Sequence, residues 1–131
     1  MGLDMYLYQR KRNGGKEAEL TEVMYWRKAN AIHRWFLDKT DTEADFNCGE
    51  IDVDRELLEQ FVEEGKKVLA ERYLNHTTAE QFMPTRSGFF FGGTEYDEYY
   101  YDTIERTVEK FEELIKDFDF EENELIYSCW W

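Results

Sequence analysis

The chain has 131 residues, of which 42% are hydrophobic and 18% aromatic, and its formal net charge is −14. This length predicts one domain with a sizeable core, and the negative charge opposes binding to nucleic-acid phosphates. No apolar run approaches the roughly 18 residues of a membrane span, and residues 1–5 lack the features of a signal peptide. We therefore expect a cytoplasmic protein that enters no membrane. Two cysteines, Cys48 and Cys129, are too few for a disulfide framework.

The charge is distributed unevenly along the chain. Residues 1–40 contain eight Lys or Arg and five Asp or Glu, whereas residues 41–131 contain eight and twenty-five. The carboxylates are interpreted either as solvated helix faces or as a surface that meets a basic protein or mimics a nucleic acid. Ordinary nucleic-acid binding is not expected.

The first third of the chain combines strand and helix patterns. Leu3 to Gln9 alternate apolar and polar residues, which predicts a strand with one buried face. After a polar loop over residues 10–16, residues 19–24 fit either a second short strand or the approach to a helix. We expect the first helix over residues 25–39. Its apolar seam comprises Tyr25, Ala29, Ile32 and Phe36.

The remainder of the chain predicts two longer helices and a closing strand. Residues 50–53 are typical of a short strand, and Asp54 is suited to cap a second helix. The seam of that helix comprises Leu57, Leu58, Phe61, Val62, Gly65, Val68 and Leu69. After an irregular segment over residues 73–93, Thr94–Asp97 has the form of a capping box, which predicts a third helix from Glu95. Residues 125–131 indicate an aromatic strand beside the N-terminal strand.

These elements predict the fold class. The strands are too short and too regularly alternating for a buried parallel sheet. We therefore expect a single α+β domain over residues 1–131, with about three helices packed on one face of a small, mainly antiparallel sheet.

The segment from Tyr25 to Phe36 is the first candidate binding surface. As a helix, it would align Trp26, Asn30 and His33, with Arg27 and Arg34 on an adjoining polar line. A helix whose role is only to pack against the core seldom carries so many polar hydrogen-bond donors beside its apolar seam. His33 is interpreted either as a hydrogen-bonded packing residue or as a functional residue, namely a general base, a ligand-binding donor or a metal ligand.

The loop over residues 84–94 is the second candidate. Three phenylalanines bracketed by glycines predict a buried strand between tight turns. In the functional interpretation, Thr85, Arg86 and Ser87 line a pocket beside the first helix. Thr94 stands where a P-loop requires lysine. Because no metal-ligand spacing, cofactor fingerprint or nucleophile–base motif is recognised, we expect no metal, no cofactor and no catalytic residue.

Four segments stand out together: MGLDMYLY (1–8), YWRKANAIH (25–33), PT with GFFFG (84–92) and EYDEYY (95–100). They resemble a family of small uncharacterised proteins encoded by bacteriophages and prophages. The aromatic tail is also similar, although Cys129 precedes the tryptophans where the family tends to have a second serine. The resemblance implies an accessory phage protein in the cytoplasm of the bacterial host. It implies no reaction.

Two functional hypotheses from different classes follow. In the first, the chain is an acidic, non-enzymatic phage protein that binds a host protein, as an inhibitor or anti-defence factor. In the second, the 25–36 helix and the 84–96 loop enclose a small anionic, nucleotide-like ligand, with rings stacked on a base and arginines on phosphate. The residues expected to bind it are Trp26, Arg27, Asn30, His33, Arg34, Thr85, Arg86, Ser87 and Tyr96. A hydrolase or transferase with His33 as its base is a third, less favoured hypothesis.

Overall fold

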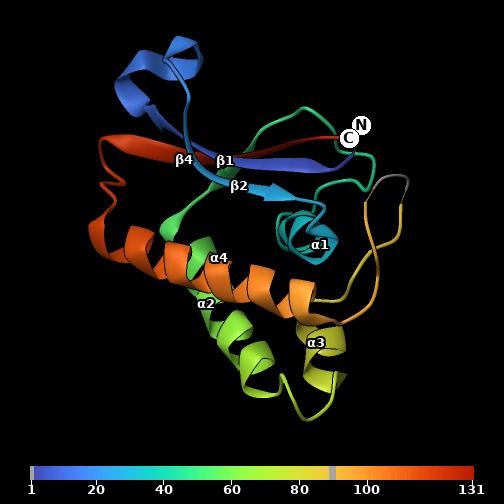
Figure 1. Cartoon of the computed structure of the whole chain (residues 1–131). Coiled ribbons are helices and arrows are strands. Elements are labelled where there is room, and N and C mark those ends of the chain that lie inside the picture. The colour runs from blue at the N-terminus through green and yellow to red at the C-terminus, as the bar shows by residue number, and fades with distance from the viewer. Residues whose placement is uncertain (1, 89–90) are drawn as a thin grey trace.

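Four strands form one antiparallel sheet in the computed structural model, which describes residues 2–88 and 91–131 (Figure 1). The strands are β1 (Asp4–Lys11), β2 (Thr21–Arg27), β3 (Ile51–Val53) and β4 (Asn123–Trp130), in the spatial order β2-β1-β4-β3. All three pairings are antiparallel, and β4 lies directly beside β1. The predicted antiparallel sheet and the place of the closing strand are thus confirmed.

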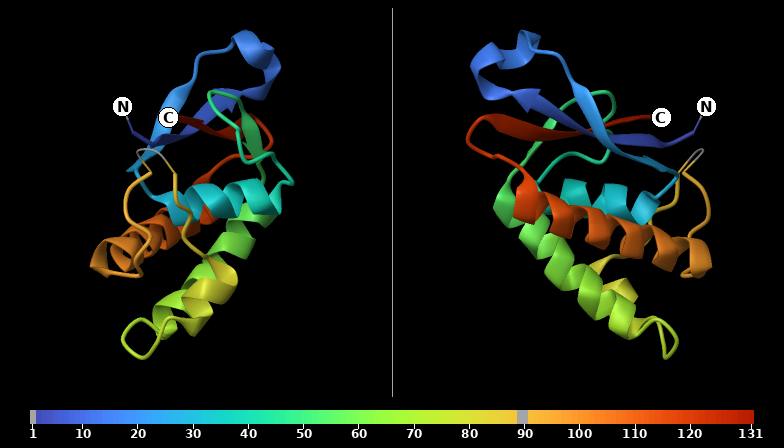
Figure 2. Two further views of the ribbon diagram at one scale, coloured as in Figure 1. Left: turned by 90° about the vertical axis from the view of Figure 1, so that its right-hand side faces the viewer. Right: turned by 60° about the vertical axis from the view of Figure 1, so that its left-hand side comes forward.

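The four α-helices of the described residues lie below the sheet in Figure 1, whereas a short 3-10 helix lies above it. They are α1 (Asn30–Lys39), α2 (Arg55–Ala70), α3 (Thr77–Phe82) and α4 (Glu98–Asp117), with a 3-10 helix, η1 (Arg12–Glu17), in the β1–β2 connection. Figure 2 shows α1, α2 and α4 on one side of the sheet. This confirms the α+β fold class with helices on one sheet face. None of the helices in this part of the chain combines the length and apolar character that a membrane crossing requires.

The predicted first helix begins too early. Residues 21–27 form β2, in which Trp26 is opposite Met5 of β1 and Arg27 is opposite Asp4. Lys28 then takes a left-handed backbone conformation with φ of 54° and donates its N–H to Leu3 O at 2.7 Å. Hydrogen bonding to β1 therefore determines that residues 25–27 are a strand, although their spacing also fits a helix. Of the two alternatives for residues 19–24, the strand is the right one. Trp26 does not share a helix face with Asn30 and His33.

Three further boundaries differ from the prediction. α4 begins at Glu98 rather than Glu95, because the Asp97 side chain is the N-cap and accepts from Tyr100 N at 3.0 Å. The short helix α3 lies in the segment expected to be irregular. Of the predicted buried strand, residues 89–90 lie outside the described part, and Gly88 and Phe91 belong to no strand, although Phe91 is buried.

The core lies between the sheet and the helices, with Trp26 at its centre. Trp26 is fully buried, and its ring is edge-on to those of Phe36, Phe111 and Tyr127 at 6.2–6.3 Å. Its Nε1 donates to Thr107 Oγ1 on α4 at 2.7 Å. Where α2 crosses α4, a Cβ on Gly65 would lie 2.6 Å from Val108 Cγ2. Only glycine permits that approach, as its place on the α2 seam indicated.

Candidate functional site

Asn30 joins the start of α1 to the loop over residues 84–97. Its side chain is buried, and Nδ2 donates to Phe91 O at 3.0 Å and to Gly93 O at 2.8 Å. Its Oδ1 accepts from Arg86 N at 2.9 Å. All three bonds end on backbone groups that a side chain of another shape would leave unsatisfied. Asn30 therefore holds both limbs of the loop, and we call this contact the asparagine clamp.

Other predicted site residues strengthen the same junction. Arg34 Nη1 donates to Thr85 O at 2.9 Å, and Thr85 Oγ1 donates to Thr94 O at 2.9 Å across the loop. Tyr96 OH accepts from Thr85 N at 3.3 Å. The polar residues that sequence reasoning assigned to ligand contact are thus bonded to the chain itself. Their hydrogen bonds fix the shape of the loop.

A cavity of about 300 Å³ lies beside the clamp, between the end of β2, the start of α1 and the first turns of α4. Its lining includes the basic residues Arg27 and Lys28 and the acidic residues Glu95 and Asp97. Asn30 and Thr85 contribute polar atoms, and Tyr99 OH donates to the carbonyl oxygen of Arg27 at its rim. The site combines two cations, two carboxylates and apolar walls, so it can take a small ligand that carries both charge and apolar surface.

The backbone around this cavity is tightly constrained. Gly92 has a φ of 88°, and a Cβ there would lie 3.0 Å from Lys28 Cβ. Lys28 itself is a non-glycine residue at positive φ. Such conformations persist only where the surrounding structure fixes them. Here the pairing of β2 with β1 and the asparagine clamp on either side fix the mouth of the cavity.

His33 lies in the core and not on the cavity wall. It is fully buried, its Nδ1 is 2.6 Å from Tyr127 OH, and its ring is edge-on to Phe91. Burial, assisted by the positive charge of Arg86, lowers the pKa of His33 to about 4. Its Nε2 has no hydrogen-bond partner within the described residues. His33 is therefore neutral near pH 7 and acts as a packing residue, the first of its two interpretations.

The predicted site residues separate into two groups. Arg27, Asn30 and Thr85 line the cavity, whereas the remaining six do not. Trp26 is a core residue, Arg86 Nη2 donates to Ala44 O at 2.7 Å, and Ser87 is exposed. The structure adds lining residues that sequence reasoning missed: Lys28, Glu95, Asp97, Tyr99, Tyr100 and Thr103. Recognition of Asp97 as the N-cap would have indicated most of them, because it places residues 99–103 in the first turns of α4.

Comparison with known proteins identifies no relative: no protein-family model matches the chain, and no curated protein or solved structure matches it.

Proposed function

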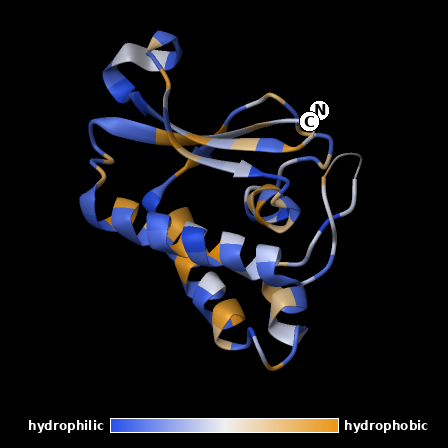
Figure 3. Cartoon of the chain, viewed as in Figure 1, coloured by the Kyte–Doolittle hydropathy of each residue, from blue (hydrophilic) through white to orange (hydrophobic). Residues whose placement is uncertain are grey.

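We propose that this chain is a phage- or prophage-encoded accessory protein that binds a basic surface of a host protein, as an inhibitor or anti-defence factor, without catalysis. The observation that supports it most is the solvent face of α4. That face exposes the carboxylates of Glu98, Asp102, Glu105, Glu109, Glu112, Glu113 and Asp117, against two exposed cations, Arg106 and Lys116. Hydrophilic residues dominate its outward turns in Figure 3. The resemblance of the sequence to phage proteins supports the cellular setting.

Ion pairs neutralise only part of this face. Asp102 and Glu105 bind Arg72, and Glu112 lies 2.9 Å from Lys66. No ion pair within the described residues involves Glu98, Glu109 or Asp117. Unpaired carboxylates attract a basic partner and thereby raise the association rate constant. Salt screens the charges and weakens this electrostatic steering.

Capture of host proteins at low and high salt tests the proposal. The variant Glu98→Gln/Glu109→Gln/Asp117→Asn should slow association with the captured protein about tenfold at low salt. The matched variant Arg106→Gln/Lys116→Gln removes the cations of the same helix and should leave association unchanged or faster. A captured partner that is acidic, or equal association rates for the two variants, would contradict the proposal.

The cavity favours a second candidate, the binding of a small anionic, nucleotide-like ligand. Arg27 and Lys28 line it, and Tyr99 and Tyr100 supply rings on which a base could stack. Adenosine monophosphate should then raise the thermal unfolding midpoint, because a ligand that binds only the folded state stabilises it. Lys28→Ala should abolish that shift, and Ser87→Ala, away from the cavity, should retain it. An unchanged midpoint for the natural sequence would eliminate this candidate.

A further inference from the structure

The two faces of the sheet have different surroundings. Helices α1, α2 and α4 cover one face. Within residues 2–88 and 91–131, the other side carries only the short 3-10 helix η1 at the β1–β2 end and the segment that leads into β3 (Figures 1 and 2). Because side chains alternate along a strand, the residues of β1 between the buried Leu3, Met5 and Leu7 point to this open face. Two of them, Tyr6 and Tyr8, are half-buried tyrosines.

Aromatic rings from three neighbouring strands gather there. Tyr6 and Tyr8 are stacked with ring centroids 5.5 Å apart, and the Tyr25 ring of β2 lies 5.3 Å from Tyr6. On β4, Trp130 is opposite Asp4 and is 68% exposed. We call these four residues, Tyr6, Tyr8, Tyr25 and Trp130, the tyrosine face. Aromatic side chains concentrated on one exposed surface are typical of protein interfaces.

Carboxylates surround the tyrosine face. Tyr8 of β1 is opposite Glu22 of β2 on one side and opposite Ile126 of β4 on the other. Asp52 of β3 is in turn opposite Ile126. Neither carboxylate takes part in an ion pair of the described residues. Asp4 accepts from Tyr25 OH and, at 2.9 Å, from Arg27 Nη1. Unpaired negative charge therefore lies on either side of Tyr8, whereas the carboxylate beside Tyr25 is paired with Arg27.

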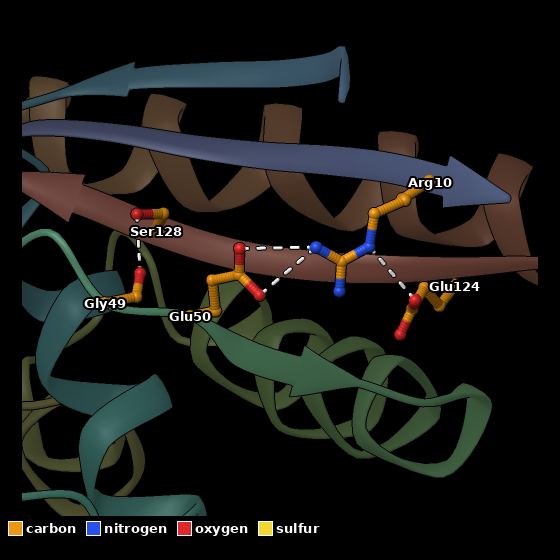
Figure 4. Close-up of polar contacts among 5 residues, drawn as sticks. All are labelled: Arg10, Gly49, Glu50, Glu124 and Ser128. Carbon is orange, nitrogen blue, oxygen red and sulfur yellow. Dashed lines mark hydrogen bonds and ion pairs between the residues drawn. The ribbon is translucent and has the colours of Figure 1, made fainter. Parts of the chain in front are cut away.

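Arg10 marks the boundary of this surface. Its Nε donates to Glu124 at 3.1 Å and its Nη1 lies 3.3 Å from both oxygens of Glu50, so that the guanidinium crosses β4 between them (Figure 4). Beside it, Ser128 Oγ donates to Gly49 O at 2.7 Å and holds in place the segment that leads into the edge strand β3. Since two carboxylates neutralise Arg10, it does not repel a cationic partner. The part of the sheet face around Arg10 and Ser128 is therefore covered by the chain itself, whereas the tyrosine face is accessible to a partner.

We propose that the tyrosine face docks an extended segment of a partner protein that carries Lys or Arg at alternate positions. The proposal rests on the proposed function: it assigns the direct contact to the tyrosine face and leaves the electrostatic steering to α4. A cation above an aromatic ring is attracted by the negative face of the ring, and Glu22 and Asp52 add direct charge complementarity. In an extended segment, alternate side chains point to one side, so successive cations reach successive rings.

Charge favours a basic peptide over a nucleic acid here. Aromatic rings on an open sheet can also stack bases, but such surfaces attract phosphates with Lys and Arg. On this face, Arg27 is bound to Asp4 and Arg10 to two carboxylates. The phosphates of a nucleic acid would meet the carboxylates of Glu22 and Asp52, and both of these arginines are already paired with carboxylates.

Titration of the isotope-labelled full chain with a synthetic poly(Arg-Thr) peptide, followed by NMR, tests the proposal. Shift changes should cluster on Tyr6, Tyr8, Tyr25 and Trp130, and a poly(Gln-Thr) peptide should cause none. Trp130→Ala should weaken peptide binding about fivefold, as the loss of a cation–ring contact implies. The matched control is Tyr73→Ala, because Tyr73 is 82% exposed and follows the end of α2, outside the sheet, and its loss should leave binding unchanged.

Several results would overturn this inference. They are shift changes confined to α4, equal affinity of Trp130→Ala and the natural chain, absence of peptide binding, or shift changes on the four rings caused by oligothymidine alone. The mapping uses the natural sequence, so it decides the question even if a variant fails to fold. Shifts on α4 would leave the proposed function intact, whereas peptide binding here without a basic host partner would contradict only the proposed function.

Discussion

The asparagine clamp and the tyrosine face use polar and aromatic side chains in opposite ways. At the clamp, Asn30 is buried and its three hydrogen bonds all end on the 84–97 loop. On the tyrosine face, Tyr25 and Trp130 are exposed, and the unpaired carboxylates of Glu22 and Asp52 lie on either side of Tyr8. Satisfied polar groups stabilise a fold, whereas exposed rings beside unpaired charges remain available to a partner. A dense polar cluster in the sequence is therefore weaker evidence for binding than it first suggests.

The largest expected effect on the free energy of unfolding comes from a comparison of two neighbouring residues of β2, one on each face of the sheet. Trp26→Ala should lower the free energy of unfolding by about 3–5 kcal/mol, because it removes a fully buried ring. Its neighbour Tyr25 points to the open face, and Tyr25→Ala should cost less than about 1 kcal/mol. Chemical denaturation of both variants gives these values. Similar losses for the two would mean that the open face is part of the core.

The buried histidine predicts a pH dependence of stability. The folded state holds the pKa of His33 at about 4, below the ordinary 6.5, so the unfolded state binds the extra proton first as the pH falls. Stability should therefore decrease between pH 6.5 and about 4, by roughly 3 kcal/mol at most. Denaturation at several pH values should show that His33→Gln removes most of this slope. An unchanged slope for the His33 variant would refute the assignment.

The clamp itself should contribute to stability. Asn30→Ala leaves two carbonyl oxygens and one amide without their partner, which should cost about 2–3 kcal/mol. Ser87→Ala changes an exposed residue of the same loop and should stay within about 0.5 kcal/mol of the natural chain. Thermal or chemical denaturation checks both values. A stable Asn30 variant that loses binding of a small ligand would instead favour the cavity as the functional site.

The smallest expected change in stability is on the tyrosine face. Trp130 is 68% exposed at the end of β4, so Trp130→Ala should lower the free energy of unfolding by less than about 0.5 kcal/mol. Denaturation compared with Tyr73→Ala, another exposed ring, measures this directly. A loss of several kcal/mol for Trp130→Ala alone would assign the ring to the structural frame.

Much of the fold was predictable from local pattern. The alternation in β1, the seam of α2 and the cap at Asp54 are all present in the sequence, and each corresponds to an element of the structure. Residues 25–27 were assigned to a helix because a run of three residues is too short to distinguish the helical period of about 3.6 residues from the strand period of about two. Their pairing with β1 decides between the two, and pairing between distant segments is not visible in local spacing.

The site was predictable only in part. Sequence reasoning brought Asn30 and Thr85 to one place, but it could not show that their partners would be backbone groups of the loop. The alternation in residues 3–9 indicated that Leu3, Met5 and Leu7 lie on the buried side of the strand, opposite Tyr6 and Tyr8, but not which residues of β2 and β4 lie beside the two tyrosines. That depends on the topology, because the sheet order places β1 between β2 and β4.

The most direct test of this contrast is a paired measurement of unfolding free energy and poly(Arg-Thr) affinity for Asn30→Ala and Trp130→Ala. We predict that Asn30→Ala loses stability and keeps its peptide affinity, whereas Trp130→Ala keeps its stability and loses affinity. The reverse result, with peptide binding dependent on Asn30 and unaffected at Trp130, would contradict the assignment of one region to structure and the other to binding.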